Sequence, residues 1–179
     1  MEKVETIERE RRWLLCESNE EGAKKVLQDL ESTLLLYKKV EIKQWYISTN
    51  PVIRLRSHDD KDYVLCVKTR GKKSGLGVPE KESELNREEF DNLFKFVVKE
   101  PIVKTRYYIS LENGLTAELD VFRDILTGLI VVEVEFESDE EAASFIPPVW
   151  FGDKEITGNR GYANSTLYGL MPGLNSNKK

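Results

Sequence analysis

Glutamate and arginine alternate near the start of the chain, where Glu8, Glu10 and Arg12 occupy every second position. Alternate residues of an extended strand project from one face, so a strand over residues 6–15 would place these three side chains side by side. Carboxylates coordinate hard cations, and a guanidinium is suited to phosphate oxygens. The opening segment is therefore a candidate for binding a cation and an anion together.

Six later segments repeat this alternation, and in each of them one face carries charges of a single sign. Glu80, Glu82 and Glu84 share one such face, and we assign Glu82 and Glu84 to the functional set. The carboxylates of the set are Glu8, Glu10, Glu82, Glu84, Glu118, Asp120, Glu133 and Glu135. Its bases are Arg12, Arg54, Arg56, Lys68, Lys104 and Arg106.

The simpler interpretation of such alternation is an antiparallel sheet with its charged face in water. A solvated face normally mixes the two signs, however, because like charges directly opposite each other destabilise a sheet. Here the acidic strands and the basic strands form separate sets. We therefore expect a closed sheet with a charged interior and an apolar exterior covered by helices.

Hydrophobic periodicity supplies the elements that this arrangement needs. Strands are expected at 42–48, 52–57, 63–70, 79–85, 102–110, 115–123 and 129–137, in addition to the opening segment. Helices are expected at 20–36, after the N-cap candidate Asn86, and at 139–145. The predicted fold class is α+β, an eight-stranded antiparallel closed β-barrel with helices packed on the outside.

Length and composition narrow the class of protein. A chain of 179 residues fits one domain, which we place at residues 1–170 with a polar tail at 171–179. The net charge of −5 is unlike that of a general nucleic-acid binder. Two cysteines without metal-site spacing favour a reduced, cytoplasmic protein, and no apolar run is long enough to span a membrane. We expect neither a nucleic acid nor a membrane as partner, and a homodimer is compatible with the sequence.

Two further features are not expected to take part in catalysis or phosphate binding. His58 lies in an acidic turn, where we expect it to be solvated rather than a catalytic base. The segment RGKKSGLG lacks the strand-to-helix context of a phosphate-binding loop, so we expect a hairpin loop near the mouth of the barrel.

The ordered charged segments resemble the CYTH superfamily, the triphosphate tunnel metalloenzymes. The opening ERERR is similar to the ExExK signature of that superfamily, at Glu8, Glu10 and Arg12. The segments that agree in order are QWYI, IRLR, VKTRG, EKESEL, VKTRYYI, AELDVF, VVEVEF and EITGNRGYANSTL, so the likeness covers residues 5 to 168. Two positions depart from it, since Arg12 stands in place of the usual lysine and Asn159 in place of an aspartate.

The resemblance implies a tunnel that binds a triphosphate-containing small molecule with Mg²⁺ or Mn²⁺. It assigns metal binding to Glu8, Glu10, Glu118, Asp120, Glu133 and Glu135, and phosphate binding to Arg12, Arg54, Arg56, Lys68, Lys104 and Arg106. It assigns catalytic roles to Glu8, Glu10, Arg12, Glu82, Glu84, Glu118 and Asp120.

The favoured function is metal-dependent hydrolysis of inorganic triphosphate, a reaction that needs positioning and charge neutralisation more than covalent chemistry. Alternatives are a thiamine triphosphatase, a class IV adenylate cyclase and a non-catalytic polyphosphate- or nucleotide-binding module. The cyclase would need an adenine pocket that no segment of the sequence identifies.

Overall fold

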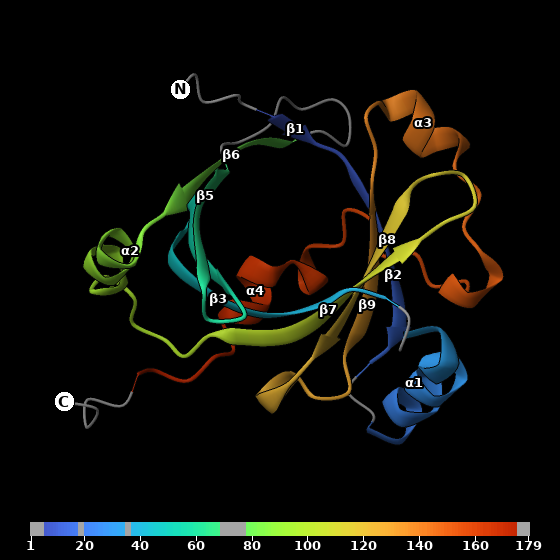
Figure 1. Cartoon of the computed structure of the whole chain (residues 1–179), viewed down its shortest axis with the longest axis horizontal. Coiled ribbons are helices and arrows are strands. Elements are labelled where there is room, and N and C mark those ends of the chain that lie inside the picture. The colour runs from blue at the N-terminus through green and yellow to red at the C-terminus, as the bar shows by residue number, and fades with distance from the viewer. Residues whose placement is uncertain (1–5, 18–19, 35–36, 69–77, 175–179) are drawn as a thin grey trace.

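The structure, a computed structural model, describes residues 6–17, 20–34, 37–68 and 78–174 (Figure 1). Its strands are β1 (Thr6–Glu8), β2 (Glu10–Cys16), β3 (Lys39–Thr49), β4 (Val52–His58), β5 (Asp62–Lys68), β6 (Val78–Leu85), β7 (Ile102–Ser110), β8 (Thr116–Phe122) and β9 (Ile130–Glu135). Its α-helices are α1 (Glu20–Leu34), α2 (Arg87–Phe94), α3 (Asp139–Ser144) and α4 (Asn164–Tyr168). Short 3-10 helices lie at Asp124–Leu126, Val149–Phe151 and Arg160–Tyr162. The segment RGKKSGLG, with the expected end of a strand at residue 70, lies outside the described residues.

The nine described strands form one antiparallel sheet in the order β1-β6-β5-β4-β3-β7-β8-β9-β2. The two edge strands, β1 and β2, are joined in the chain through Arg9, so the sheet curls into a nearly closed barrel (Figure 1). The expected count of eight differs by one because the opening strand is interrupted at Arg9. The predicted barrel is confirmed.

The helices cover apolar residues on the outside of the barrel. Trp13, Leu119 and Val132 pack with Ala23 of α1 and Ala142 of α3. A second outer cluster joins Trp45 and Leu55 to Phe90 of α2. Helix α2 begins at the expected cap, where the Asn86 side chain accepts a hydrogen bond from the Glu89 backbone and the Glu89 side chain accepts one in return.

One end of the barrel interior is filled by apolar side chains. The inward positions change from charged to apolar along several strands, from Arg12 to Leu14 on β2 and from Glu133 to Val131 on β9. These apolar residues pack against Leu167 and Tyr168 of α4. We call this cluster the floor; its members are Leu14, Tyr46, Ile102, Phe122, Leu129, Val131, Ile156, Leu167, Tyr168 and Met171. The floor closes the barrel on the side of α4, which is visible behind the opening in Figure 1.

The packed region extends beyond residue 170, where a polar tail was expected to begin. Met171 is buried in the floor, and the Leu174 amide donates to the Val98 carbonyl at 3.0 Å. The described chain therefore remains ordered against the barrel up to residue 174. Among the described helices, none combines the length and the apolar character needed to cross a membrane.

Candidate active site

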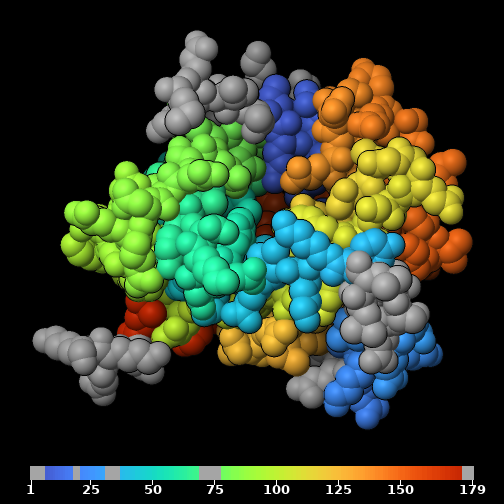
Figure 2. Space-filling view, viewed as in Figure 1, coloured from blue at the N-terminus to red at the C-terminus, as the bar shows by residue number. Residues whose placement is uncertain are grey.

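A cavity of about 710 Å³ occupies the barrel above the floor. Figure 2 shows it as a hollow, with red atoms of the C-terminal segment visible at its bottom. Its polar lining residues are Glu8, Arg9, Glu10, Arg12, Tyr46, Arg54, Arg56, His58, Lys68, Glu80, Glu82, Arg106, Tyr108, Glu118, Glu133, Glu135, Asn164 and Ser165. The barrel therefore brings together charged residues from distant parts of the sequence.

Arg54, Arg56 and Lys68 line one side of the cavity, which we call the basic side. Lys68 and Arg54 share a carboxylate there. The Glu80 carboxylate lies 3.0 Å from Arg54 Nη2 and 3.0 Å from Lys68 Nζ. Lys68 also pairs with Glu8. Burial would raise the pKa of Glu80, but the positive charges of Lys68 and Arg54 outweigh it and lower that pKa to about 2. Glu80 is thus a buried counter-ion to the basic side.

Arg56 has much less negative charge beside it. Its Nη1 lies 3.8 Å from a carboxylate oxygen of Glu82, a side chain that is 46% exposed. Its Nε is buried and has no hydrogen-bond partner among the described residues. Burial, followed by the positive charges of Arg54 and Arg106, lowers the pKa of Arg56. An anion in the cavity would supply the missing counter-charge.

The other side of the cavity, which we call the acidic side, has an excess of negative charge. Its carboxylates are Glu8, Glu10, Glu118, Glu133 and Glu135. Burial, followed by the negative charge of Glu133, raises the pKa of Glu10 to about 8. Glu135 keeps an exposed side chain at the cavity; partial desolvation, followed by the charges of Glu118 and Glu8, raises its pKa to about 7. The pKa values of Glu8 and Glu118 are also raised, chiefly by burial. This side of the cavity has more carboxylates than its nearby cations neutralise.

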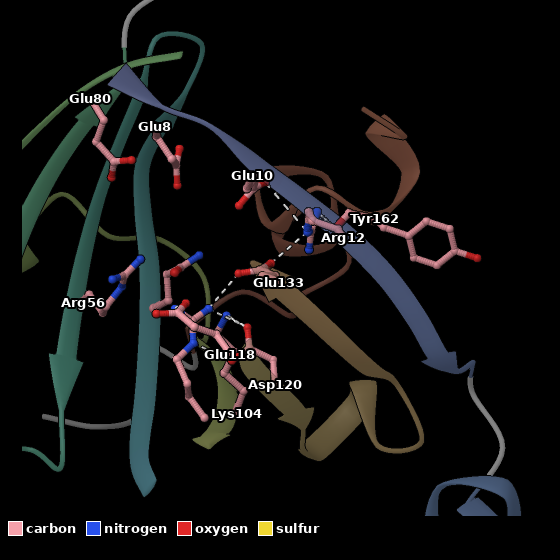
Figure 3. Close-up of polar contacts among 12 residues, drawn as sticks. Glu8, Glu10, Arg12, Arg56, Glu80, Lys104, Glu118, Asp120, Glu133 and Tyr162 are labelled. Atoms are coloured by element: carbon pink, nitrogen blue, oxygen red, sulfur yellow. Dashed lines mark hydrogen bonds and ion pairs between the residues drawn. The ribbon is translucent and has the colours of Figure 1, made fainter. Parts of the chain in front are cut away.

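Arg12 and Arg106 join the two sides of the cavity near the floor, and Figure 3 shows Arg12 between Glu10 and Glu133. Arg12 Nε lies 2.8 Å from Glu133, and Arg12 Nη1 donates to the Tyr162 carbonyl at 3.1 Å. Arg106 binds Glu133 at 2.9 Å and pairs with Glu118. Burial would raise the pKa of Glu133, but Arg12, Lys104 and Arg106 lower it. Glu133 therefore stays ionised between these bases.

Lys104 and Asp120 point inward as expected but do not reach the cavity surface. The side chains are 1% and 0% exposed, and they pair with each other. Asp120 also accepts two hydrogen bonds from Arg106, from Nε and Nη2, each at 2.7 Å. Burial lowers the pKa of Lys104 to about 8, against the opposing effect of Asp120. In this structure the pair orients Arg106 from below instead of lining the cavity.

The glutamates of strand β6 that line the cavity are not the two that were expected. Glu80, which was left out of the functional set, is the residue buried in the wall. Glu82 lies at its border, and Glu84 is exposed outside the lining. Alternation had placed all three on one face, and the depth of each depends on the stagger of β6 against β1 and β5.

Three polar lining residues with ring side chains, Tyr46, His58 and Tyr108, were not predicted as site residues. Tyr46 is buried, and its hydroxyl accepts a hydrogen bond from Gln44 Nε2 at 2.6 Å. His58 and Tyr108 lie beside Arg56 and Arg106, so His58 is not simply solvated. Extending the alternation by one step beyond Arg56 and beyond Arg106 would have found His58 and Tyr108.

The donor set of the acidic side fits a hard divalent cation. Glu8, Glu10, Glu118, Glu133 and Glu135 line one cavity and offer only oxygen ligands, which Mg²⁺ and Mn²⁺ prefer. A second group, Cys66 with Glu80 and Glu82, has potential ligand atoms within 4.8 Å of one another. It fits less well, because Arg54 and Lys68 already neutralise Glu80, and burial raises the pKa of the Cys66 thiol to about 12.

The sequence of the chain is similar to those of known enzymes. No family model matches the chain. A curated relative from Nitrosomonas europaea, named inorganic triphosphatase, is 37% identical over 136 residues, which cover 74% of this chain and 87% of the relative. A second inorganic triphosphatase, from Acetivibrio thermocellus, is 33% identical over 135 residues, covering 74% of this chain and 82% of the relative.

The chain belongs to the inorganic triphosphatase family.

Solved structures agree with this membership. The crystal structure of the inorganic triphosphatase NE1496 is 31% identical, with a TM-score of 0.58, over 93% of this chain and 97% of that chain. HpAC1 from Hippeastrum matches at 18% identity and a TM-score of 0.52, over 78% of this chain and 83% of that chain, a likeness of fold alone. The resemblance inferred from the charged segments is confirmed, while the roles of individual site residues stay predictions.

Proposed function

We propose that this chain hydrolyses inorganic triphosphate in its barrel with the help of a divalent cation. The observation that carries the proposal is the double imbalance of charge in one cavity. Arg56 lacks a close counter-ion on one side, while Glu10 and Glu135 are crowded by other carboxylates on the other. A phosphate chain with a bound cation would relieve both. The names of the relatives support triphosphate as the anion.

The basic residues bind and orient the phosphate chain in this proposal. Arg56 and Arg54 donate to its oxygens, since each has a buried Nε without a partner among the described residues. Arg12 and Arg106 contact it from the acidic side while their bonds to Glu133 hold them in place. Lys68 remains a phosphate ligand, whereas Lys104 acts through Asp120 and Arg106.

The acidic side holds the cation. Glu8, Glu10, Glu118, Glu133 and Glu135 would bind it, and Asp120, the sixth predicted ligand, lies beneath them in contact with Arg106. We propose Mg²⁺ or Mn²⁺, which when bound would neutralise charge on the phosphate oxygens. Of the other predicted catalytic acids, Glu82 at the border can orient water, and the exposed Glu84 has no such position.

Parallel assays of phosphate release test the proposal, with tripolyphosphate, ATP and thiamine triphosphate as substrates, each with Mg²⁺ and with excess EDTA. We expect metal-dependent release of orthophosphate, fastest with tripolyphosphate. Arg56→Ala should lower the affinity for tripolyphosphate by about tenfold to a hundredfold. Its control is Arg87→Ala, which removes an exposed arginine of α2. Cyclic AMP from ATP would identify a cyclase instead, and binding without turnover would identify a binding module.

A further inference from the structure

The closed end of the cavity contains polar atoms that the proposed roles leave unused. Asn164 of α4 lines the cavity, and its Oδ1 is buried with no hydrogen-bond partner among the described residues. Arg12 Nη2, on strand β2, is also buried and has no hydrogen-bond partner among the described residues. Arg12 Nη1 holds the carbonyl of Tyr162, two residues before Asn164. An acceptor and a donor thus lie on neighbouring elements at the bottom of the cavity.

The floor decides how a linear phosphate chain can lie in this cavity. Leu14 follows Arg12 toward the floor and Val52 precedes Arg54, and both pack in the apolar cluster with Leu167 and Tyr168. A chain that lies along the barrel axis therefore places its terminal phosphate at the floor end, beside Arg12 and Arg54. The oxygen that bridges this phosphate to the next then points toward the mouth.

In-line displacement requires the attacking water to approach opposite the leaving oxygen. With the chain in this orientation, the water must lie between the terminal phosphorus and the floor. Asn164 Oδ1 is an unpartnered acceptor on that side. We propose that Asn164 is a catalytic residue that accepts a hydrogen bond from the attacking water, while Arg12 Nη2 donates to the terminal phosphate. This inference rests on the proposed function and adds the direction of attack and the phosphorus attacked.

The step balances without a further reactant. A bond forms between the water oxygen and the terminal phosphorus, and the bond from that phosphorus to the bridging oxygen breaks with its electron pair on diphosphate. One water proton remains on orthophosphate and the other ends on diphosphate, so triphosphate of charge about −5 gives products of about −2 and −3, following from the phosphate ionisations near neutral pH.

Hydrolysis of tripolyphosphate by the wild-type protein in ¹⁸O-labelled water tests which phosphorus is attacked. Attack on the terminal phosphorus puts the label in orthophosphate, whereas attack on the central phosphorus puts it in diphosphate. We expect label in orthophosphate, and label in diphosphate would overturn the inference. If the wild-type protein does not hydrolyse tripolyphosphate at all, the proposed function itself fails.

Three variants test the role of Asn164. Asn164→Ala should lower kcat by about tenfold to a hundredfold, because the water loses its orientation. Its KM, and its Kd for tripolyphosphate measured by calorimetry with Ca²⁺, should stay within about threefold of wild type. Asn164→Asp keeps an acceptor, so it should recover part of kcat while its charge beside the phosphate raises KM. Thr166→Ala, at an exposed residue of the same helix, is the matched control and should behave as wild type.

A kcat of Asn164→Ala within about threefold of wild type, or a loss confined to KM and Kd, would overturn the assignment. Melting temperatures of all three variants separate a folding defect from a catalytic one. The isotope experiment uses the unaltered chain and decides which phosphorus is attacked even if Asn164→Ala does not fold.

Discussion

Glu10 and Glu80 show how one residue type takes opposite roles within a single cavity. Glu80 lies between Arg54 and Lys68, which lower its pKa to about 2. Glu10 is half-buried near Glu133, with Arg12 Nε 3.8 Å away, and its pKa is raised to about 8. Glu80 therefore stabilises the fold in its charged form. The charged form of Glu10 destabilises the fold until the carboxylate binds a proton or a cation.

The two residues should respond in opposite ways to removal of their charge. Glu80→Gln should lower the melting temperature at pH 7.5 by about 3 °C or more, equivalent to about 1 kcal/mol, because the buried Arg54 loses its nearest counter-ion and Lys68 loses one of two. Glu10→Gln should leave it unchanged or raise it in metal-free buffer, while activity falls by orders of magnitude. Thermal unfolding and phosphate release measured on the same samples check this, and a destabilised Glu10→Gln would show that Glu10 is a structural counter-ion.

The sign of the pH dependence follows from the same shifts. Because the pKa of folded Glu10 is above the ordinary value of 4.5, the folded state binds its proton more tightly between pH 4.5 and about 8, and stability falls as pH rises through that range. The contribution of Glu80 is present above pH 4.5 and is lost as pH falls toward 2. The advantage of Glu10→Gln over wild type should accordingly grow from pH 5 to pH 9.

At the scale of elements, the sequence predicted which way side chains point but not how deep they lie. The period of two in a strand is a local property, so Arg54, Lys104 and Glu133 could be assigned inward from their neighbours alone. Depth depends on the stagger between strands, which pairs residues distant in sequence. Glu80 replaced Glu84 in the wall for this reason, and Lys104 lies beneath the cavity.

The floor was not predicted either. Its residues are apolar positions at the ends of strands and in the C-terminal segment, where apolar side chains look alike whether they face the interior or the exterior. Leu14 and Val131 belong to strands whose other inward positions are charged, and the packing of α4 explains the change. The segment EITGNRGYANSTL could be matched to a family, but its place under the cavity required the structure.

The floor should be a main contributor to the stability of the barrel. Leu167→Ala removes a buried side chain from it and should cost about 2–4 kcal/mol in the free energy of unfolding. Leu170→Ala is the control, because Leu170 lies three residues on and is 66% exposed, so it should cost less than about 0.5 kcal/mol. Chemical denaturation of both variants checks this, and equal effects would mean that the floor is loosely packed.

At the scale of the whole molecule, a net charge of −5 coexists with a cavity built for an anion. The structure reconciles the two by separating the signs, since basic side chains gather on β4 and β5 while β9 and the opening strands are mainly acidic inside. A cation bound to the acidic side would extend the positive region across the cavity. We therefore expect cation binding to precede or accompany binding of the phosphate chain.

Cation binding should stabilise the fold, and more so at higher pH. A ligand that binds only the folded state raises the melting temperature, and protons compete with it for Glu10 and Glu135, whose pKa values are about 8 and about 7. Millimolar Mg²⁺ should therefore raise the melting temperature more at pH 8.5 than at pH 6, and Glu10→Gln should reduce that difference. Differential scanning fluorimetry with Mg²⁺, Mn²⁺ and no added cation measures it. A Mg²⁺ shift that is the same at both pH values would place the cation away from these carboxylates, because only ligands that give up protons in this range link its binding to pH.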